Sequence, residues 1–484
     1  MKRLFFFFTL ILTTLFTTMG WATDWYVRPA GGNYGNEDGT SYENAWDGSA
    51  VWASIQPGDT LWICGTHTSE FGINDSGTAD AYITVRGDYP GDPGVIDVNF
   101  SANQAIWIGS RSYIVLDSLT VKNANIHGLH INGCSHILVR NIEAYNNKRS
   151  GITVANSSTN VSLVNCHTHD NGEQGHLCQG INLTDSSSNI TVKNCLSHNN
   201  GNFTDTDGRG INLSNVSYVT IENSRFYSDG QGRDGPGCGI EIYDADHITV
   251  KYCTVWNEKD AIEARGNDPE TNPNSSDYLE VYYCLFYNVG RGVLYGEYPV
   301  DGGQECEYGK FYNNTIYGGS GFLVYSPNND MRNNLIYVDT SDSQGIKFEY
   351  MTLADIDTCT EDYNYVYYVD GSWYIISNAS DDSWHGYYTP SAWHTDYPSM
   401  AANDFVGDLK FTSNYHLSRN SPCIDAGTKL NIHDSSWQDL DGNRVRYGTA
   451  PDIGCYEYHS WALGRWGCMP WAGADYKVQW APYT

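Results

Sequence analysis

A short motif recurs through the middle of the chain and constrains the fold more than any other feature: glycine, an apolar residue, any residue, and a second apolar residue. It begins at Gly128, Gly151, Gly180, Gly210, Gly239, Ala261, Gly292, Gly321 and Gly345. A second apolar segment, such as "ITVKNC" or "VTIENS", follows most copies. Short β-branched strands repeated at such intervals are typical of stacked coils, in which each coil buries its apolar face against the next. We therefore predict an all-β solenoid.

The alternation of side chains along a strand divides each motif into inward and outward positions. In "GIEI" the two isoleucines face the interior, so Glu241 faces outward. Alignment of the coils places the equivalent outward residues in one column: His130, Thr153, Asn182, Asn212, Glu241, Glu263, Leu294, Leu323 and Lys347. Neighbouring strands lie about 4.8 Å apart. We predict that the column from Asn182 to Glu263 forms a continuous polar stripe on the outer wall.

The segment "KDAIEAR", residues 259–265, crowds two acids and two bases at this stripe. Carboxylates on adjacent strands repel each other, so Glu241 and Glu263 require compensation. The candidate cations are Lys259, Arg265, Arg209 and, one coil later, Arg291. A Ca²⁺ ion with oxygen ligands from Asn212, Glu241 and Glu263 would also compensate. The alternative is an ordinary solvated charged surface.

Long turns occur next to the same strands, whereas most other turns are short. They are residues 170–179, 199–209 and 228–238, which lead into the strands, and residues 266–277 and 296–308, which leave them. Long loops on a rigid scaffold commonly carry binding and catalysis. We predict that these loops wall a groove whose floor is the stripe, and His176 and Asp207 are candidate site residues within them.

Aromatic rings form another outward column, three residues after each Cys or Asn that ends the second motif. The column contains Tyr145, His169, His198, Tyr227, Trp256, Tyr287, Tyr317 and Tyr337. Such a ladder either stacks on sugar rings or stacks on itself and stiffens the solenoid. Both readings stay open for Tyr227 and Trp256, and self-stacking is favoured for the others.

The composition excludes some partners. A formal net charge of −30 argues against nucleic acid, and a polyanionic substrate requires local cations. Among the thirteen cysteines, Cys166, Cys195, Cys253 and Cys284 share one coil position and are predicted to form a buried stack, whereas Cys423 and Cys455 are a candidate disulfide pair. His167, His169 and His176 lack the spacing of a zinc motif, so zinc is not favoured.

The N-terminus has the pattern of a secretory signal peptide. Lys2 and Arg3 precede an apolar and threonine-rich run, and small residues follow it at the −3 and −1 positions of the expected cleavage site, Gly20 and Ala22. The run is too short for a membrane anchor, which is the alternative reading. We expect cleavage near Ala22 and a secreted monomer without a membrane span.

Segments at both ends extend the interpretation. The entry segment "DWYVRPAGGNYGNEDGTSYENAWDG" and the exit segment "DLDGNRVRYGTAPDIGCYEY" resemble those of bacterial secreted right-handed parallel β-helix proteins, the pectate-lyase-like and chondroitinase-B-like polysaccharide-active superfamily. The resemblance implies a right-handed parallel β-helix. The expected divisions are a signal peptide (1–22), a cap with first coils (23–98), the β-helix (99–349), a loop-rich closing segment (350–459) and a Trp-rich tail (460–484).

The resemblance implies a substrate class but no reaction. The pectate-lyase-like group implies an Asp cluster and a Lys where Asn182 and Asn212 stand here. The alginate-lyase group implies Asn, Glu-x-Glu, Lys and Arg-His-Gly; similar residue types occur here on different coils, without the Arg-His-Gly. Polygalacturonase-like hydrolases imply paired Asp residues, of which "DTDG" at residues 205–208 is only an echo.

We therefore predict a lyase that cleaves an acidic polysaccharide by β-elimination. Lys259 or Arg265 acts as base or neutralises the substrate, Arg209 and Arg291 bind substrate carboxylates, and Asn212, Glu241 and Glu263 hold Ca²⁺. Further substrate contacts are assigned to Asn182, Tyr227, Tyr243, Trp256 and His176. One alternative is a hydrolase that uses Glu241 with Glu263, or Asp207 with Glu241. The other is a non-catalytic protein that binds glycans at an extracellular surface.

Overall fold

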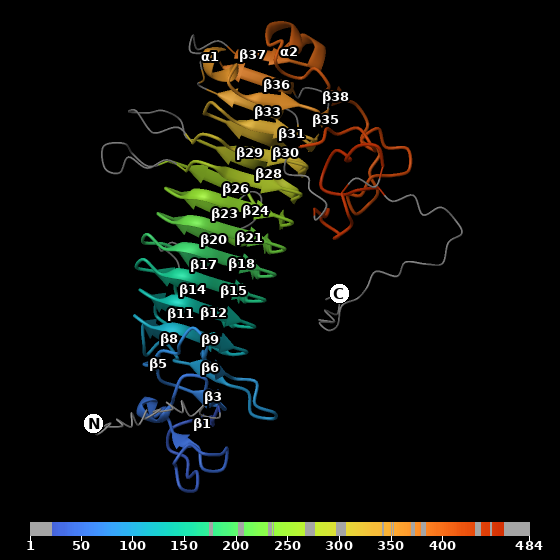
Figure 1. The fold of residues 1–484 in the computed structure, drawn as a ribbon. Coiled ribbons are helices and arrows are strands. Elements are labelled where there is room, and N and C mark those ends of the chain that lie inside the picture. Colours follow the sequence, from blue (N-terminus) through green and yellow to red (C-terminus); the bar gives the residue numbers. More distant parts are fainter. Residues whose placement is uncertain are drawn as a thin grey trace, which may run out of the picture.

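The chain forms one long parallel β-helix, in which strands from successive coils stack along a single axis (Figure 1). The computed structural model describes residues 22–173, 178–201, 208–230, 235, 237–266, 276–296, 306–340, 343–349, 351, 353–368, 373–378, 384–430, 437–445 and 448–458. The predicted solenoid is confirmed. The predicted signal peptide and the Trp-rich tail lie outside the described residues, except for Ala22.

From β3 to β36, each coil contributes strands to three faces, and the strand order repeats from coil to coil. Face 1 consists of β1 (Asp24–Arg28), β2 (Trp46–Asp47), β3 (Thr60–Ile63), β6 (Ile83–Arg86), β9 (Ser112–Asp117), β12 (Ser135–Arg140), β15 (Thr159–Val164), β18 (Ser188–Lys193), β21 (Ser217–Glu222), β24 (Asp246–Lys251), β27 (Leu279–Tyr282), β29 (Lys310–Tyr312), β31 (Asp330–Arg332) and β34 (Thr360–Asp362).

Face 2 carries the Gly-apolar-x-apolar motif. It consists of β5 (Phe71–Ile73), β8 (Gln104–Gly109), β11 (His127–Asn132), β14 (Ser150–Ala155), β17 (Cys178–Leu183), β20 (Gly208–Ser214), β23 (Cys238–Tyr243), β26 (Asp260–Arg265), the second halves of β28 (Leu285–Tyr295) and β30 (Thr315–Val324), then β33 (Gln344–Glu349) and β36 (Trp373–Asn378). The antiparallel strand β37 (Trp384–Tyr387) pairs with β36.

Face 3 is built from shorter strands that lead into the long turns. It consists of β4 (Thr66–His67), β7 (Val95–Asp97), β10 (Thr120–Lys122), β13 (Glu143–Tyr145), β16 (His167–His169), β19 (Leu196–His198), β22 (Arg225–Tyr227), β25 (Thr254–Trp256), the first halves of β28 and β30, then β32 (Leu335–Val338), β35 (Tyr365–Tyr368) and β38 (Phe405–Val406). Helices are short: the 3₁₀-helix η1 (Trp52–Ser54), α1 (Leu353–Ile356) and α2 (Pro390–Asp396).

The interior is a set of aligned aliphatic columns. Ile152, Ile181, Ile211, Ile240 and Ile262 follow one another in strict register, and each is fully buried. Burial of one such side chain contributes about 1.5–3 kcal/mol, and the column repeats this contribution at every coil. The predicted cysteine stack is also buried, and its thiols are free. The proposed pairing of Cys423 with Cys455 is wrong, because both are free in the structure.

The corners of the coils explain why asparagine is so abundant. Asn141, Asn165, Asn194 and Asn223 occupy the turn from face 1 to face 3, and all four have φ values between 51° and 56°. Asparagine tolerates this left-handed backbone better than most residues. The corner therefore closes at the same point in successive coils.

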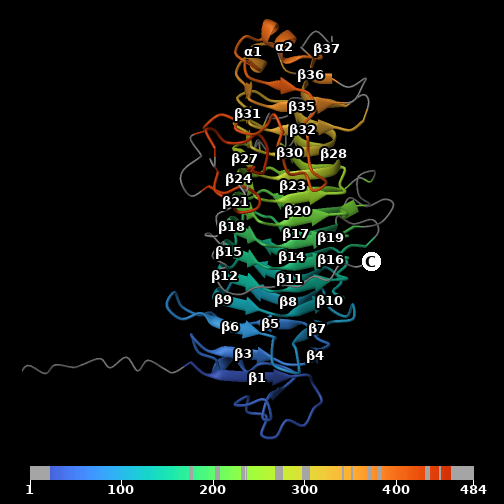
Figure 2. The same cartoon turned by 90° about the vertical axis from the view of Figure 1, so that its right-hand side faces the viewer.

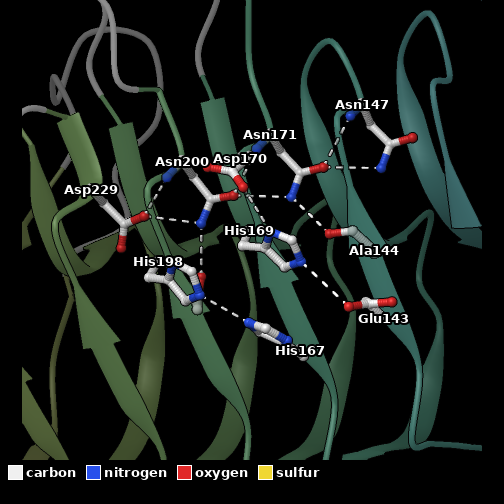
Figure 3. Close-up of polar contacts among 11 residues, drawn as sticks. Glu143, Ala144, Asn147, His167, His169, Asp170, Asn171, His198, Asn200 and Asp229 are labelled. Atoms are coloured by element: carbon white, nitrogen blue, oxygen red, sulfur yellow. Dashed lines mark hydrogen bonds and ion pairs between the residues drawn. The ribbon is translucent and has the colours of Figure 1, made fainter. Parts of the chain in front are cut away.

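A ladder of buried polar side chains connects the coils where face 3 turns toward face 2 (Figure 3). Asn147, Asn171 and Asn200 are each at most 1% exposed. Nδ2 of Asn147 donates to Oδ1 of Asn171 at 2.9 Å, and Nδ2 of Asn171 donates to Oδ1 of Asn200 at 2.9 Å. Two carboxyl groups continue the ladder: Asn200 Nδ2 donates to Asp229 Oδ1 at 2.9 Å, and the Asp229 amide donates to Glu258 Oε1 at 2.9 Å.

The closing region is more regular than predicted. Parallel pairing continues past residue 349 through β34, β35, β36 and β38. The chain after β38 returns along the side of the helix (Figure 2), where Tyr415 stacks on Tyr287 and Trp437 contacts Tyr282. Among the described residues, every helix is too short and too polar to span a membrane.

The carboxyl end of the ladder makes stability depend on pH. Complete burial raises the pKa of Asp229 to about 8, although its hydrogen bonds from Asn200 act in the opposite direction. Burial, followed by repulsion from Asp229, also raises the pKa of Glu258. The folded state thus binds protons more tightly than the unfolded chain, so stability falls as pH rises from about 4 to about 8.

We predict that Asp229→Asn removes one proton from this dependence and flattens the stability curve by about 1.4 kcal/mol per pH unit within that window. Denaturant unfolding at a series of pH values measures the slope. Asp185→Asn is the matched control, because Asp185 is exposed and has a left-handed backbone that Asn tolerates. An unchanged slope in Asp229→Asn would show that Asp229 is ionised in the folded protein.

Candidate active site on face 2

The predicted stripe exists, and its register is confirmed. Asn182 pairs with Asn212, Asn212 with Glu241, and Glu241 with Glu263, on strands β17, β20, β23 and β26. Tyr243 pairs with Arg265 in the next outward column, as predicted. Asn212 Nδ2 donates to Asn182 Oδ1 at 2.8 Å. The side chains on this stripe are half-buried or buried although they face outward, because each is flanked by the next coil.

Arginines compensate the carboxylates of the stripe. Arg209 forms an ion pair with Glu241, and Arg265 forms one with Glu263. In these pairs the Arg265 side chain is 37% exposed, whereas that of Arg209 is 13% exposed. Arg265 is therefore the better placed of the two to meet a ligand.

A third pair extends the same surface by one coil, and the sequence interpretation missed its acid. Arg291 on β28 pairs with Asp260 on β26, with Nη2 at 2.7 Å from Oδ2. Asp260 is 1% exposed. The sequence contains the signal, because Asp260 and Arg291 occupy the same coil position, three residues before the column of Glu263 and Leu294.

Burial and the arginine partners have opposite effects on the pKa values of these acids. Desolvation raises the pKa of Glu241, and the charge of Arg209 lowers it by less. Desolvation likewise raises the pKa of Asp260, while its hydrogen bonds with Arg291 act in the opposite direction. Each arginine thus holds a carboxylate that would otherwise be costly to bury in its ionised form.

The donor set fits a calcium ion poorly. The three proposed ligands supply oxygen atoms, but Glu241 and Glu263 each contact a guanidinium group. With Asp260 and Arg291 included, the three acids balance the three arginines. Calcium sites usually gather several carboxylates around the cation, without competing cations at the same oxygens. Calcium at Asn212, Glu241 and Glu263 therefore stays an untested prediction that the charge balance does not favour.

The other predicted residues have different outcomes. Lys259 is exposed in the turn before β26. Asp207 and His176 lie outside the described residues, as does a large part of the long turns, so the predicted walls of the groove are not tested. Tyr227 and Trp256 stack on each other with centroids 4.2 Å apart, and their neighbours His198 and Tyr287 stack on the outer sides. The ladder is self-stacked, so a sugar would meet ring edges rather than ring faces.

A groove of about 830 Å³ lies on a neighbouring surface, along the outer side of face 3. Its floor includes Glu143, His167 and Arg225, and its far wall is formed by Leu440 and Tyr456 of the returning C-terminal chain. The sequence did not reveal this groove, because its two sides are far apart along the chain.

Comparison with known proteins agrees with this architecture. Residues 25–277 match the family described as Pel9A-like, right-handed β-helix region. None of the curated sequences compared with the chain is significantly similar to it.

Three solved structures are among those similar to the chain. The crystal structure of pectate lyase Pel9A is 18% identical and superposes with a TM-score of 0.53, covering 91% of this chain and 98% of that one. A GH136 lacto-N-biosidase from Eubacterium ramulus is 13% identical, with a TM-score of 0.48 and coverage of 80% and 67%. An alginate lyase from Paenibacillus sp. str. FPU-7 is 13% identical, with a TM-score of 0.38 and coverage of 80% and 98%.

The family match spans more than half of the chain and includes every coil from β1 to β26, which contains the stripe from Asn182 to Arg265. The chain therefore belongs to the Pel9A-like right-handed β-helix family.

Proposed function

We propose that this protein is a polysaccharide-degrading enzyme that binds an acidic, uronate-containing chain along face 2 and cleaves it by β-elimination. The observation that supports the proposal most strongly is the concentration of three arginine–carboxylate pairs on the neighbouring strands β20, β23, β26 and β28 of face 2. The signal-peptide pattern that ends at Ala22 supports secretion. The family match and the similarity of the fold to that of a pectate lyase support a polysaccharide substrate.

The arginines are suited to substrate carboxylates. A guanidinium group donates several hydrogen bonds in a planar fork that matches a carboxylate. Arg265 and Arg291 retain partial exposure while one edge of each contacts an acid of the protein. The acids therefore fix the direction of each guanidinium group before substrate arrives. The arginines also supply local positive charge to a protein whose formal net charge is −30.

In the proposed reaction Arg265 neutralises the uronate carboxylate, which acidifies the proton at C5. Lys259, exposed in the turn directly before β26, accepts that proton in its uncharged form. The electron pair of the C5–H bond forms the C4–C5 double bond, and the C4–O glycosidic bond breaks. The leaving oxygen takes a proton from a donor at the site or from water. Asn182 and Asn212 offer hydrogen bonds to sugar hydroxyls on the lower coils.

Hydrolysis is the second candidate, and the strand spacing favours it. Glu241 and Glu263 lie in register on adjacent strands about 4.8 Å apart. Retaining glycosidases hold their two carboxyl groups about 5–5.5 Å apart, with the general acid at a raised pKa. The raised pKa of Glu241 suits the acid, and Glu263 would be the nucleophile.

The reaction products distinguish these proposals. We predict that the purified protein releases near-ultraviolet-absorbing unsaturated oligosaccharides from one member of a polyuronate panel, and that prior removal of Ca²⁺ leaves the rate unchanged, because arginines supply the positive charge. Absorbance and reducing ends are followed together, with Ca²⁺ added back. Reducing ends without absorbance would indicate hydrolysis. A glycan mobility shift without release would indicate a binding protein. A strict Ca²⁺ requirement would contradict the role given to the arginines.

Substitution of the stripe tests its position. We predict that Arg265→Gln lowers kcat by about 10²- to 10⁴-fold in a lyase, because the C5 proton is no longer acidified. Glu241→Gln would cause the larger loss in a hydrolase. Arg332→Gln is the matched control, since Arg332 pairs with Asp330 on face 1. Steady-state kinetics on the substrate found above measures both. Full activity in Arg265→Gln and Glu241→Gln would place the active site elsewhere.

A further inference from the structure

Three histidines and a glutamate gather on the outer side of face 3, on a different surface from the arginine–carboxylate stripe (Figure 3). Glu143 belongs to β13, His167 and His169 to β16, and His198 to β19. Strand register brings them together: Glu143 pairs with His167, and His169 pairs with His198. The cluster thus spans three successive coils.

The potential donor atoms converge. One ligand atom each from Glu143, His167 and His169 lies within 4.8 Å of the other two. Nε2 of His167 lies 2.9 Å from Nε2 of His198, and Nε2 of His169 lies 3.6 Å from Oε1 of Glu143. One ligand atom each from two histidines and one carboxylate therefore surround a small volume, and His198 lies beside it against His167.

A carboxylate behind the cluster orients one of these rings. Nδ1 of His169 lies 2.8 Å from Oδ2 of Asp170. This contact turns Nε2 of His169 toward Glu143, where it is buried and has no hydrogen-bond partner among the described residues. Histidines that bind metals commonly contact a carboxylate through the other ring nitrogen in this way.

We propose that Glu143, His167 and His169 bind one transition-metal ion of the Zn²⁺ class. Zinc sites with three protein ligands keep the fourth position for water or another small ligand. Imidazole nitrogen with one carboxylate selects zinc or a neighbouring transition metal, whereas Ca²⁺ requires a set of oxygen ligands. Tetrahedral zinc with Zn–N distances of about 2.0–2.1 Å separates its ligand nitrogens by about 3.3 Å. The 3.6 Å between Nε2 of His169 and Oε1 of Glu143 is close to this separation.

The metal ion would join strands β13 and β16 of two successive coils, at one end of the face 3 groove that Glu143 and His167 line. A bound ion would therefore stabilise these coils against separation and place a positive charge at the groove. This inference is independent of the proposed function, because the arginine stripe lies on face 2.

Metal titration tests the site directly. Untagged protein is stripped of metal, dialysed, and titrated with Zn²⁺ alone or Ca²⁺ alone by calorimetry. Elemental analysis counts the bound metal ions. The absorption spectrum of the Co²⁺-substituted protein reports the coordination geometry. We predict one Zn²⁺ per chain, a raised Tm with Zn²⁺, no competition from Ca²⁺, and an intense visible Co²⁺ spectrum. His167→Ala should weaken Zn²⁺ binding by at least about 100-fold, because His167 lies at the centre of the cluster.

His247→Ala is the matched control. His247 is stacked between Tyr218 and Tyr278, with ring centroids 4.7 Å apart on either side. The His247→Ala variant should bind Zn²⁺ with the same affinity as the unaltered protein. Glu143→Gln serves as a second variant if His167→Ala fails to fold, since the Glu143 side chain is 46% exposed. Absence of stoichiometric Zn²⁺ binding, equal affinity in His167→Ala or Glu143→Gln, or displacement by Ca²⁺ would overturn the proposal.

Discussion

Parallel hydrogen bonding between successive coils is the interaction on which the rest of the structure depends. Once one coil is in register with the next, every side chain meets its counterpart at the spacing of neighbouring strands. Inside the helix this spacing makes the continuous aliphatic column from Ile152 to Ile262. At the corners it makes the asparagine ladder, whose amides satisfy one another from coil to coil. Outside, it brings groups together that the sequence separates by about one coil.

The same register makes charge placement exacting. Like charges at one coil position would stand about 4.8 Å apart, so a run of acids requires either cations or neutralisation by protons. Both solutions occur here. On face 2, Glu241, Glu263 and Asp260 receive arginine partners. In the interior corner, Asp229 and Glu258 form no ion pair with a cation of the described residues, and burial raises the pKa of each. Ion pairs thus occur on the surface where a ligand can reach them, and the proton-dependent pair is enclosed.

Periodic features of the molecule could be predicted from sequence, because the solenoid turns periodicity into contact. The inward and outward assignment of "GIEI" and the alignment of Asn182, Asn212, Glu241 and Glu263 followed from alternation and from the repeat. Features that break the period could not be predicted. The return of the chain after Val406 builds a groove from residues more than two hundred positions apart, such as His167 and Tyr456. Partner choice was equally hidden, since repeat position alone does not tell which arginine reaches which acid.

The histidine cluster shows how a solenoid can hide a site from motif reading. Metal motifs are recognised by fixed spacing on one element, and His167, His169 and His176 lack such spacing. In stacked coils, the relevant interval is one coil, whose length varies with its loops. Glu143, His167 and His198 lie on successive coils and meet because β13, β16 and β19 are adjacent strands. The arginine–carboxylate stripe on face 2 and the histidine cluster on face 3 thus follow from one rule. A residue's position within its coil, rather than its distance along the sequence, determines which side chains it contacts.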